Sequence, residues 1–298
     1  MTVRRLTAEP ATDHRAELGE GPVWDADRNR VVWVDIPGRA ILVTDPSTGH
    51  TESLPTPSEI GAVALVGSGG YVAALQDGVY LGDGTEPWQL LAEIEASDET
   101  MRMNDGKCDP HGAFVGGTIS RDGKRGVASL YRVNEQGTTE RLLTGVSISN
   151  GLDWTADGTT MYYIDTPTRT VMAYPYDYGS PTLGQPEPVV EIPESQGFPD
   201  GMTLDSEGCL WVGMWGGHAI HRYTPNGILD TVIDLPVTNV TSCAFGGQDF
   251  GTLFITTASS GADEKDGIDE PMAGALFQLQ VGVSGRPPTP FGSNKDRA

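Results

Sequence analysis

The stretch "GMTLDSEGCLWVGMWGGHAIHRYTPNGILDTVIDLP", residues 201–236, indicates the fold of this protein. It divides into the segments "GMTLDS", "CLWVGMW", "AIHRYTP" and "ILDTVIDLP", which are separated by turns rich in Gly, Asn and Pro. Each segment is short and rich in β-branched or aromatic residues, a composition typical of strands. Four successive short strands joined by tight turns are typical of one blade of a β-propeller.

The same pattern of a strand, a polar turn and a second strand recurs along the chain. The recurring units begin at Gly21, Gly61, Gly106, Gly151, Gly201 and Ser242, at intervals of 40, 45, 45, 50 and 41 residues. This spacing predicts an all-β fold, a six-bladed β-propeller with four-stranded blades, as a single domain over residues 1–298. A β-sandwich, the alternative for so many strands, does not usually repeat at such a regular interval.

A closed ring requires that the two ends of the chain share a blade, because an open ring would leave unpaired strand edges. The candidate terminal strands are "VRRLTAE" (residues 3–9) and "GALFQLQV" (residues 274–281). We therefore expect the ring to be closed by terminal strands.

Composition and charge restrict the partners of the chain. With 41 acidic and 19 basic residues the formal net charge is −22, which disfavours binding to nucleic acid or to anionic membranes. The N-terminus has no apolar run of the kind found in signal peptides or membrane anchors, so a cytoplasmic location is expected. The three cysteines, Cys108, Cys209 and Cys243, show no CxxC spacing and are expected to be structural. The sequence leaves the oligomeric state open.

Polar residues stand just before or at the beginning of several predicted inner strands, which line the central channel of a propeller. These residues are Glu20, Arg102, Asn104, Asp105, Asn150 and Asp200, and a glycine follows each of them directly or within a few positions. We expect them to converge on one end of the channel. Two carboxylates and an amide oxygen brought together suit a hard divalent cation, whereas each residue alone could simply form a polar turn.

The motifs "GEGPVWD", "RMNDGKCDP", "ISNGLDW", "YYIDT", "PDGMTLDSEGCLWV" and "WGG" resemble those of the regucalcin/gluconolactonase (SGL) family. The resemblance runs from about Glu17 to Gly274. It implies one divalent cation, Ca²⁺ or Zn²⁺ with Mg²⁺ or Mn²⁺ as alternatives, and hydrolysis of a sugar lactone in carbohydrate metabolism. It further implies that Glu20, Asn150 and Asp200 are metal ligands, that Arg102 and Asn104 contact the substrate, and that Asp200 is the general base.

One departure from the family pattern concerns the loop after "GTI". Members of the regucalcin type carry an acidic pair where this chain has Ser120 and Arg121, so the substrate preference of the family does not transfer. This loop is expected on the same face as the metal. Two alternatives remain open: another ester or organophosphate hydrolase that uses the same metal propeller, and a non-catalytic propeller that binds a cation or senses a ligand.

Overall fold

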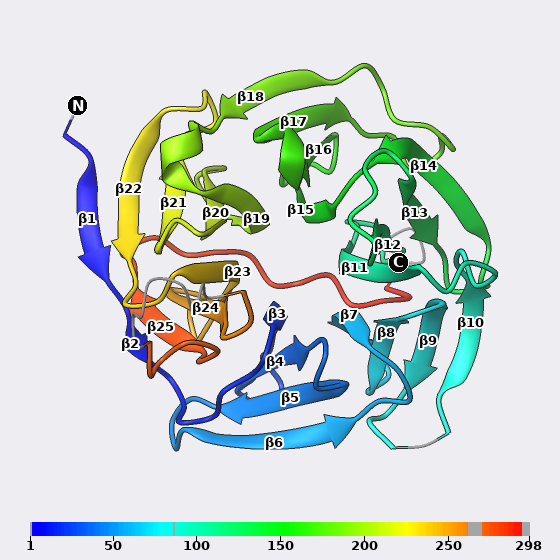
Figure 1. Cartoon of the computed structure of the whole chain (residues 1–298), viewed down its shortest axis with the longest axis horizontal. Coiled ribbons are helices and arrows are strands. Elements are labelled where there is room, and N and C mark those ends of the chain that lie inside the picture. Colours follow the sequence, from blue (N-terminus) through cyan, green and yellow to red (C-terminus); the bar gives the residue numbers. More distant parts are fainter. Residues whose placement is uncertain (1, 86, 262–269, 294–298) are drawn as a thin grey trace.

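The computed structural model describes residues 2–85, 87–261 and 270–293, and it shows an all-β propeller. Its sheets are arranged radially around a central channel, as Figure 1 shows. The described residues contain no α-helix, only the two 3₁₀ turns η1 (Thr166–Thr168) and η2 (Glu194–Gln196). No helix in the described part of the chain is long and apolar enough to cross a membrane.

Four of the sheets are separate, antiparallel and four-stranded, and each is built from consecutive strands. The first contains β3 (Gly19–Asp25), β4 (Arg30–Asp35), β5 (Ala40–Asp45) and β6 (His50–Pro55). The second contains β7 (Ile60–Leu65), β8 (Tyr71–Leu75), β9 (Gly78–Gly82) and β10 (Gln89–Glu93). The third contains β11 (Met101–Cys108), β12 (Phe114–Ser120), β13 (Ala128–Val133) and β14 (Thr139–Val146). The fourth contains β15 (Ser149–Trp154), β16 (Thr160–Asp165), β17 (Thr170–Pro175) and β18 (Glu187–Glu191).

The remaining strands form one nine-stranded sheet. Its members are β19 (Phe198–Leu204), β20 (Leu210–Trp215), β21 (Ala219–Tyr223), β22 (Leu229–Asp234), β23 (Asn239–Gly246), β24 (Thr252–Ala258), β25 (Phe277–Gln280), β1 (Arg4–Thr7) and β2 (Glu9–Pro10). The prediction of six four-stranded blades is therefore wrong. The physical reason is a backbone bridge between Trp215 and Asn239, which joins β20 to β23, together with the addition of β1 to β22 as a further strand.

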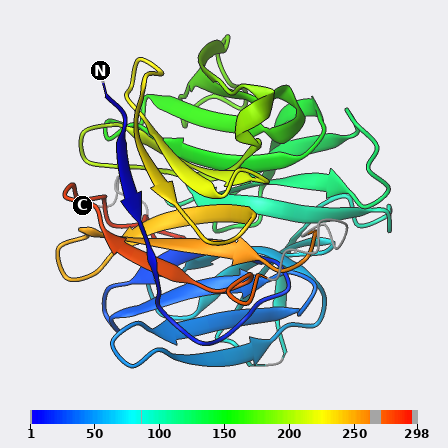
Figure 2. The same ribbon diagram turned by 60° about the vertical axis from the view of Figure 1, so that its left-hand side comes forward.

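The N-terminal strands lie along the outer edge of this large sheet (Figure 2). Strand β1 pairs in parallel with β22, from Arg4 opposite Thr231 to Thr7 opposite Asp234. Strand β2 pairs with β25, so the first residues of the chain are hydrogen-bonded to a strand near its end. Both pairings cover strand edges that would otherwise be free to associate with other chains.

The innermost strands β3, β7, β11, β15, β19 and β23 contact one another in this order around the channel. Apolar side chains fill the spaces between neighbouring sheets, and Trp33, Trp154 and Trp211 are among the largest that are fully buried. Cys108, Cys209 and Cys243 are also buried and unpaired. A rigid, well-packed ring of this kind holds the ends of the inner strands in fixed positions.

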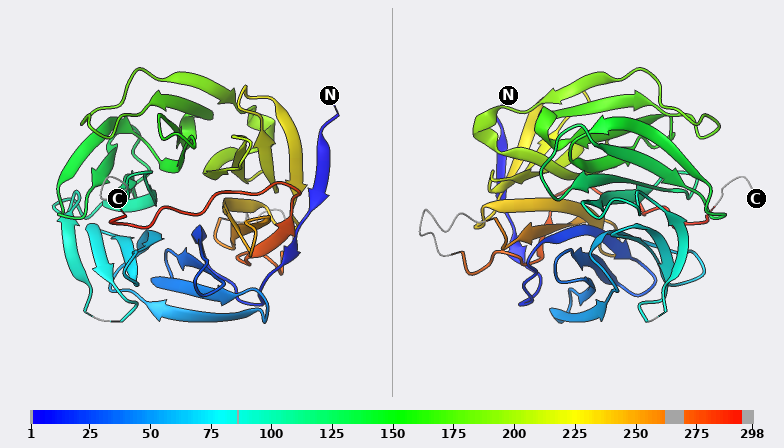
Figure 3. Two further views of the ribbon diagram at one scale, coloured as in Figure 1. Left: turned by 180° about the vertical axis from the view of Figure 1, so that it is seen from behind. Right: turned by 45° about the vertical axis from the view of Figure 1, so that its right-hand side comes forward.

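One end of the channel is crossed by the C-terminal segment, residues 282–293, which is red in the views from the front and from behind (Figures 1 and 3). Gly285 forms a backbone bridge with Asp205, and Phe291 forms one with Val66. Asp205 and Val66 follow the last residues of β19 and β7, so the segment lies at the end of the channel where the inner strands finish. The end where the inner strands begin lies opposite.

Candidate metal and substrate site

Every innermost strand has a β-bulge at the same level, near its beginning. The antiparallel register shifts between Glu20 and Val23, Ile60 and Ala62, Met103 and Gly106, Asn150 and Leu152, Pro199 and Met202, and Val240 and Ser242. A bulge interrupts the pairing of a strand and redirects a side chain, and bulges are frequent next to active sites. The predicted site residues therefore lie at or beside a ring of bulges, on the face opposite the C-terminal segment.

Glycines beside the predicted ligands make this geometry possible at two positions. Gly21 follows Glu20 and has a φ of 51°, in the left-handed region that glycine adopts without strain. Gly151 follows Asn150, and a β-carbon at this position would lie 2.6 Å from the carbonyl oxygen of Asp200. Adjacent inner strands can therefore approach closely where the polar side chains converge.

Glu20 and Asp200 are both buried, with exposed fractions of 8% and 5%. Burial raises the pKa of Glu20 well above its usual value, and the nearby carboxylates of Asp200 and Asp105 add to this shift. Burial and the Asp105 carboxylate likewise raise the pKa of Asp200. The Oδ1 atom of Asp200 is buried and has no hydrogen-bond partner among the described residues. Three carboxyl groups are thus close together without enough donors to satisfy them.

The amide of Asn150 is held in one orientation by neighbours on both sides. Its Nδ2 donates to the Thr166 hydroxyl at 2.8 Å, and its Oδ1 accepts from Asn104 Nδ2 at 2.9 Å. The Thr166 hydroxyl in turn donates to the Pro199 carbonyl at 2.9 Å. The amide nitrogen is therefore committed to Thr166, and the amide oxygen keeps one lone pair for a further partner.

Arg102 and Asn104 lie on β11 next to this amide. Arg102 Nη1 donates to Asn104 Oδ1 at 2.7 Å and to the Met103 carbonyl at 2.9 Å. Asn104 Nδ2 also donates to the Ser149 carbonyl at 2.8 Å. The structure thus brings together all five predicted site residues, with Arg102, Asn104 and Asn150 in one hydrogen-bonded chain and Glu20 and Asp200 in one electrostatic cluster.

Asp105 and Thr166 belong to the same neighbourhood. Asp105 was expected at this end of the channel but without a role as ligand or substrate contact, and Thr166 was not predicted. Burial raises the pKa of Asp105 to about 6, and the charge of Lys107 opposes this shift. The sequence signals were present, since Asp105 lies in "RMNDGK" and Thr166 ends "YYIDT". A sequence pattern does not reveal that Thr166 orients the amide of Asn150, because that contact joins η1 to β15.

Two further aspartates position the segments that precede the ligands. The carboxylate of Asp35 accepts from the backbone amides of Glu17 and Leu18, at 3.0 and 3.2 Å. The carboxylate of Asp165 accepts from the amides of Ser147 and Ile148 in the same way. Each aspartate is the last residue of the second strand of its sheet. The segments that lead to Glu20 and to Asn150 are therefore held by the same type of hydrogen bond, from backbone amides to an aspartate carboxylate.

Behind the cluster, a cavity of about 530 Å³ extends from Gly21 and Asp105 to the C-terminal segment. Lys107 Nζ lies in this region, 3.3 Å from an oxygen of Asp153, and donates to the Met202 carbonyl at 3.0 Å. Arg286 of the C-terminal segment lies 3.6 Å from the other oxygen of Asp153. Asp153 is therefore paired with two basic groups, and the C-terminal segment covers this end of the channel.

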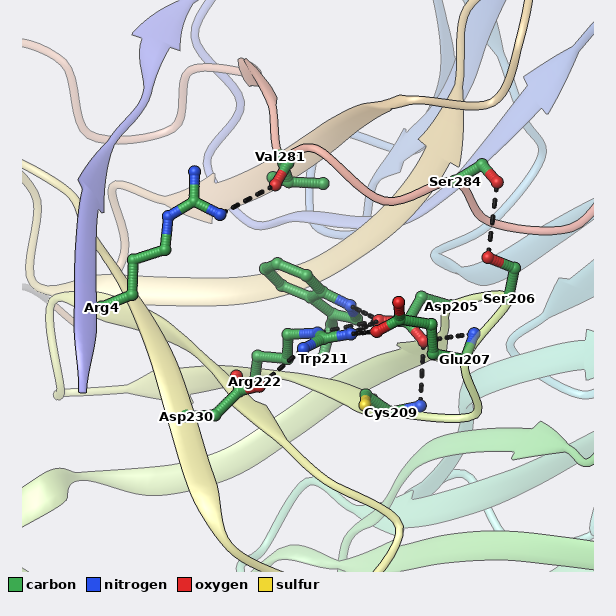
Figure 4. A network of polar contacts seen from close by, with 10 residues as sticks. All are labelled: Arg4, Asp205, Ser206, Glu207, Cys209, Trp211, Arg222, Asp230, Val281 and Ser284. Carbon is green, nitrogen blue, oxygen red and sulfur yellow. Dashed lines mark hydrogen bonds and ion pairs between the residues drawn. The ribbon is translucent and has the colours of Figure 1, made fainter. Parts of the chain in front are cut away.

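A second acidic group, Asp205, Glu207 and Cys209, lies at the opposite end of the channel (Figure 4). The Arg222 guanidinium donates to Asp205 at 2.6 Å and to Glu207 at 2.7 Å, and Trp211 Nε1 donates to Asp205 at 2.9 Å. Burial raises the pKa of Cys209 to about 11, so its thiol stays protonated at neutral pH. Because Arg222 is already bonded to both carboxylates, this group is a structural ion-pair network.

The cluster around Glu20 and Asp200 has the properties expected of a divalent cation site. It combines two buried carboxylates and an amide oxygen, and it has an unpartnered oxygen on Asp200. Oxygen ligands of this kind suit Ca²⁺, Mg²⁺ or Mn²⁺, and a bound dication would remove the repulsion between the carboxylates. Glu20, Asn150 and Asp200 are therefore the residues that fit a metal.

Comparison with known proteins identifies the class to which this fold and site belong. Residues 18–259 match the family described as the SMP-30/gluconolactonase/LRE-like region. The chain belongs to this family.

Three relatives cover nearly the whole chain. A protein of Bacillus subtilis (strain 168) named for sugar lactone lactonase activity, YvrE, is 40% identical over 94% of this chain and 96% of its own. The pentonolactonase XacC of Haloferax volcanii is 37% identical over 96% of this chain and 97% of its own. The crystal structure of a calcium-binding regucalcin from Agrobacterium tumefaciens superimposes with a TM-score of 0.91, at 30% identity, over 98% of this chain and 99% of that one.

Proposed function

We propose that this protein is a lactonase that hydrolyses a sugar lactone, with one divalent cation held by Glu20, Asn150 and Asp200. The observation that carries the proposal is the buried carboxylate pair with its unpartnered Asp200 oxygen, beside an amide oxygen held in place by its own hydrogen bonds. The family and the lactonase names of the relatives support the reaction.

The chemistry of lactone hydrolysis fits the residues around the site. A bound divalent ion would polarise the lactone carbonyl and stabilise the negative charge that develops on its oxygen when water attacks. Asp200 is the proposed general base, and its carboxylate, which has one oxygen without a hydrogen-bond partner, would take the proton of the attacking water. Arg102 keeps donors for ring and hydroxyl oxygens of the sugar, and the amide oxygen of Asn104 can accept a hydrogen bond from a sugar hydroxyl, so the two residues can orient the sugar.

The identity of the ion follows in part from its ligands. Carboxylate and amide oxygens favour hard cations, and the regucalcin of similar fold is described as calcium-binding. We propose Ca²⁺ or Zn²⁺, with Mg²⁺ and Mn²⁺ as alternatives. Among the described residues, no histidine is bonded to the five site residues, and the three cysteines are buried elsewhere, which weighs toward the oxygen-preferring ions.

The direct test measures acid release from a panel of aldonolactones, both five- and six-membered rings, in a pH-stat. The protein is stripped with a chelator, dialysed, and then supplied with each metal in turn. We expect the rate to fall to the spontaneous level on stripping and to return with at least one of the ions. Asp200→Asn, which keeps the shape of the side chain but removes the base, is expected to lower kcat by at least about a hundredfold.

Two outcomes would favour the alternatives. Hydrolysis of aryl esters or organophosphates without hydrolysis of lactones would favour another hydrolase on the same site. A metal that raises the melting temperature without supporting turnover of any of these substrates would indicate a binding or sensing propeller.

A further inference from the structure

Arg121 lies beside the substrate-contacting arginine, on the same face of the sheet. Strands β11 and β12 are antiparallel with Arg102 opposite Ile119, and the Arg121 amide donates to the Thr100 carbonyl at 2.8 Å. Strand β12 ends at Ser120, and the bond from the Arg121 amide continues its pairing with β11 by one residue, so Arg121 projects to the side on which Ile119 and Arg102 project. Arg121 is therefore the diagonal neighbour of Arg102, at the end where β11 begins.

Glu59 holds this arginine in place. It stands just before β7 and forms an ion pair with Arg121 across the gap between the second and third sheets. The Glu59 side chain is 20% exposed and the Arg121 side chain 32% exposed, so the pair is half-buried rather than a solvated surface contact. The charge of Glu59 also acts on Arg102, whose pKa is lowered by burial and by the nearby charge of Arg121.

These contacts form a polar path from the proposed metal ligands to the rim. Asn150 is bonded to Asn104, and Asn104 is bonded to Arg102. Asn150 and Asn104 are buried, whereas the half-buried side chain of Arg121 lies at the outer end of the path. A sugar lactone whose carbonyl lies at the ligand end would therefore present its far end to Arg102 and Arg121.

The charges at the outer end do not balance. Arg102 and Arg121 carry two positive charges, and Glu59 supplies one negative charge. Inside the site, a divalent ion would balance the two negative charges of Glu20 and Asp200, and the positive charge of Lys107 acts on Asp105. One positive charge is left at the rim, which suits a substrate with a single negative charge. A planar guanidinium matches a planar carboxylate well.

We propose that Arg121, fixed by Glu59, is a specificity-determining residue that selects lactones bearing a carboxylate at the end remote from the ring carbonyl, that is, monolactones of sugar dicarboxylic acids. This inference rests on the proposed lactonase function. It concerns a residue at which the chain departs from the acidic pair of regucalcin-type members. The half-buried ion pair orients the guanidinium, and the substrate carboxylate binds its remaining donors.

The test compares two substrates that differ at one carbon. Glucaric acid 1,4-lactone carries a carboxylate where glucono-1,4-lactone carries a hydroxymethyl group. The protein with its metal restored is expected to hydrolyse the carboxylated lactone with the higher kcat/KM. Arg121→Gln is expected to lower the ratio of the two kcat/KM values by about tenfold, the effect of losing one charged hydrogen bond. Arg121→Glu is expected to lower it further.

A matched control lies in the same loop. Lys124 pairs only with Asp122 among the described residues and its side chain is 61% exposed, so Lys124→Gln makes the same change of charge away from the site. This variant is expected to leave the ratio unchanged. Melting temperatures within a few degrees of the parent's show that the variants are folded.

The outcomes separate this inference from the function on which it rests. If neither lactone is hydrolysed, and no lactone of the aldonolactone panel is hydrolysed either, the lactonase proposal fails. If lactones are hydrolysed but the carboxylated lactone does not have the higher kcat/KM, the role of Arg121 is refuted. If glucono-1,4-lactone is hydrolysed and Arg121→Gln leaves the ratio unchanged, or Lys124→Gln changes it equally, the role of Arg121 is refuted while the lactonase proposal stands. A stronger preference for a lactone with a phosphate at the remote carbon would also overturn the carboxylate assignment.

Discussion

At the scale of single residues, the site is a cluster of carboxyl groups that the fold holds together against their repulsion. Glu20, Asp105 and Asp200 lie on three different strands, and burial raises the pKa of each. A raised carboxyl pKa means that the folded state holds a proton that the unfolded state releases. The metal-free protein therefore loses stability as the pH rises through this range.

Asp105 allows this effect to be measured. The ordinary pKa of Asp105 is 3.8, and its pKa in the folded protein is about 6. At pH values between these two, Asp105 is ionised in the unfolded chain and protonated in the folded chain. This pKa shift lowers the free energy of unfolding of the metal-free protein by about 3 kcal/mol at neutral pH. Asp105→Asn keeps an acceptor for the Gly106 amide and removes the titration. We expect the chelated variant to be more stable than the parent at pH 7 by about this amount, and equally stable near pH 3.

Denaturant unfolding at several pH values in the presence of chelator gives the comparison. Asp45→Asn is the control, because hydrogen bonds from Ser47 lower the pKa of Asp45, and the effect of its removal has the opposite sign. A chelated Asp105→Asn protein that is less stable than the parent at pH 7 would contradict the account of the cluster.

Thr166 tests how the amide ligand is oriented. Thr166→Val removes the acceptor of Asn150 Nδ2 and frees the amide to turn. We expect metal affinity, measured by calorimetric titration of the stripped protein, to fall by about tenfold, as is typical when a residue that supports a ligand is lost. Thr168→Val in the same 3₁₀ turn removes an exposed hydroxyl and is expected to leave the affinity unchanged. Equal effects of the two variants would contradict this role of Thr166.

At the scale of elements, the bulges of the inner strands and the C-terminal segment lie at opposite ends of the channel. The proposed ligands lie at or beside the bulges at the strand-start end, and the segment crosses the other end. The segment is also part of the core, since Phe291 is 4% exposed and packs in the apolar cluster between the second and third sheets.

The contribution of this segment can be measured through Phe291. Phe291→Ala leaves a cavity under the segment, and we expect it to lower the free energy of unfolding by about 3–5 kcal/mol. Ile228 is an apolar residue in a turn and 55% exposed, so Ile228→Ala is expected to cost less than about 0.5 kcal/mol. A Phe291→Ala cost as small as that of the control would show that the segment is not anchored.

Several features of the elements were predictable from the sequence and others were not. Strand composition and turn spacing indicated an all-β propeller, and glycines follow the proposed ligands. The number of blades was predicted wrongly, because the bridge between Trp215 and Asn239 is a backbone contact that no side-chain pattern reveals. The ion pair of Glu59 with Arg121 joins two sheets and depends on their packing, so no sequence pattern indicates it.

At the scale of the whole molecule, the ring is held by the pairing of the chain's first strands with the large sheet. Strand β1 covers the edge of β22 and β2 covers the edge of β25. The ring keeps the inner strands in register, so the geometry of the ligands depends on a closure that lies far from the site.

Deletion of residues 2–10 tests this dependence. We expect a lower melting temperature and self-association at high concentration, because the edges of β22 and β25 become free to pair with other chains. Scanning calorimetry and size-exclusion chromatography provide the measurements. Arg5→Gln, which removes only the exposed ion pair with Asp234, is expected to cost less than about 1 kcal/mol. A deletion variant as stable and monodisperse as Arg5→Gln would show that these strands are dispensable.

The central claim is that one divalent ion, held by Glu20, Asn150 and Asp200, is required for lactone hydrolysis. The most direct test titrates the stripped protein with the activating metal and measures bound metal and initial rate on the same samples. We predict that the rate rises in proportion to bound metal and reaches its plateau at one ion per chain, and that Glu20→Gln and Asp200→Asn bind the ion weakly and stay inactive. Full activity in the metal-free protein, or in either variant, would contradict the claim.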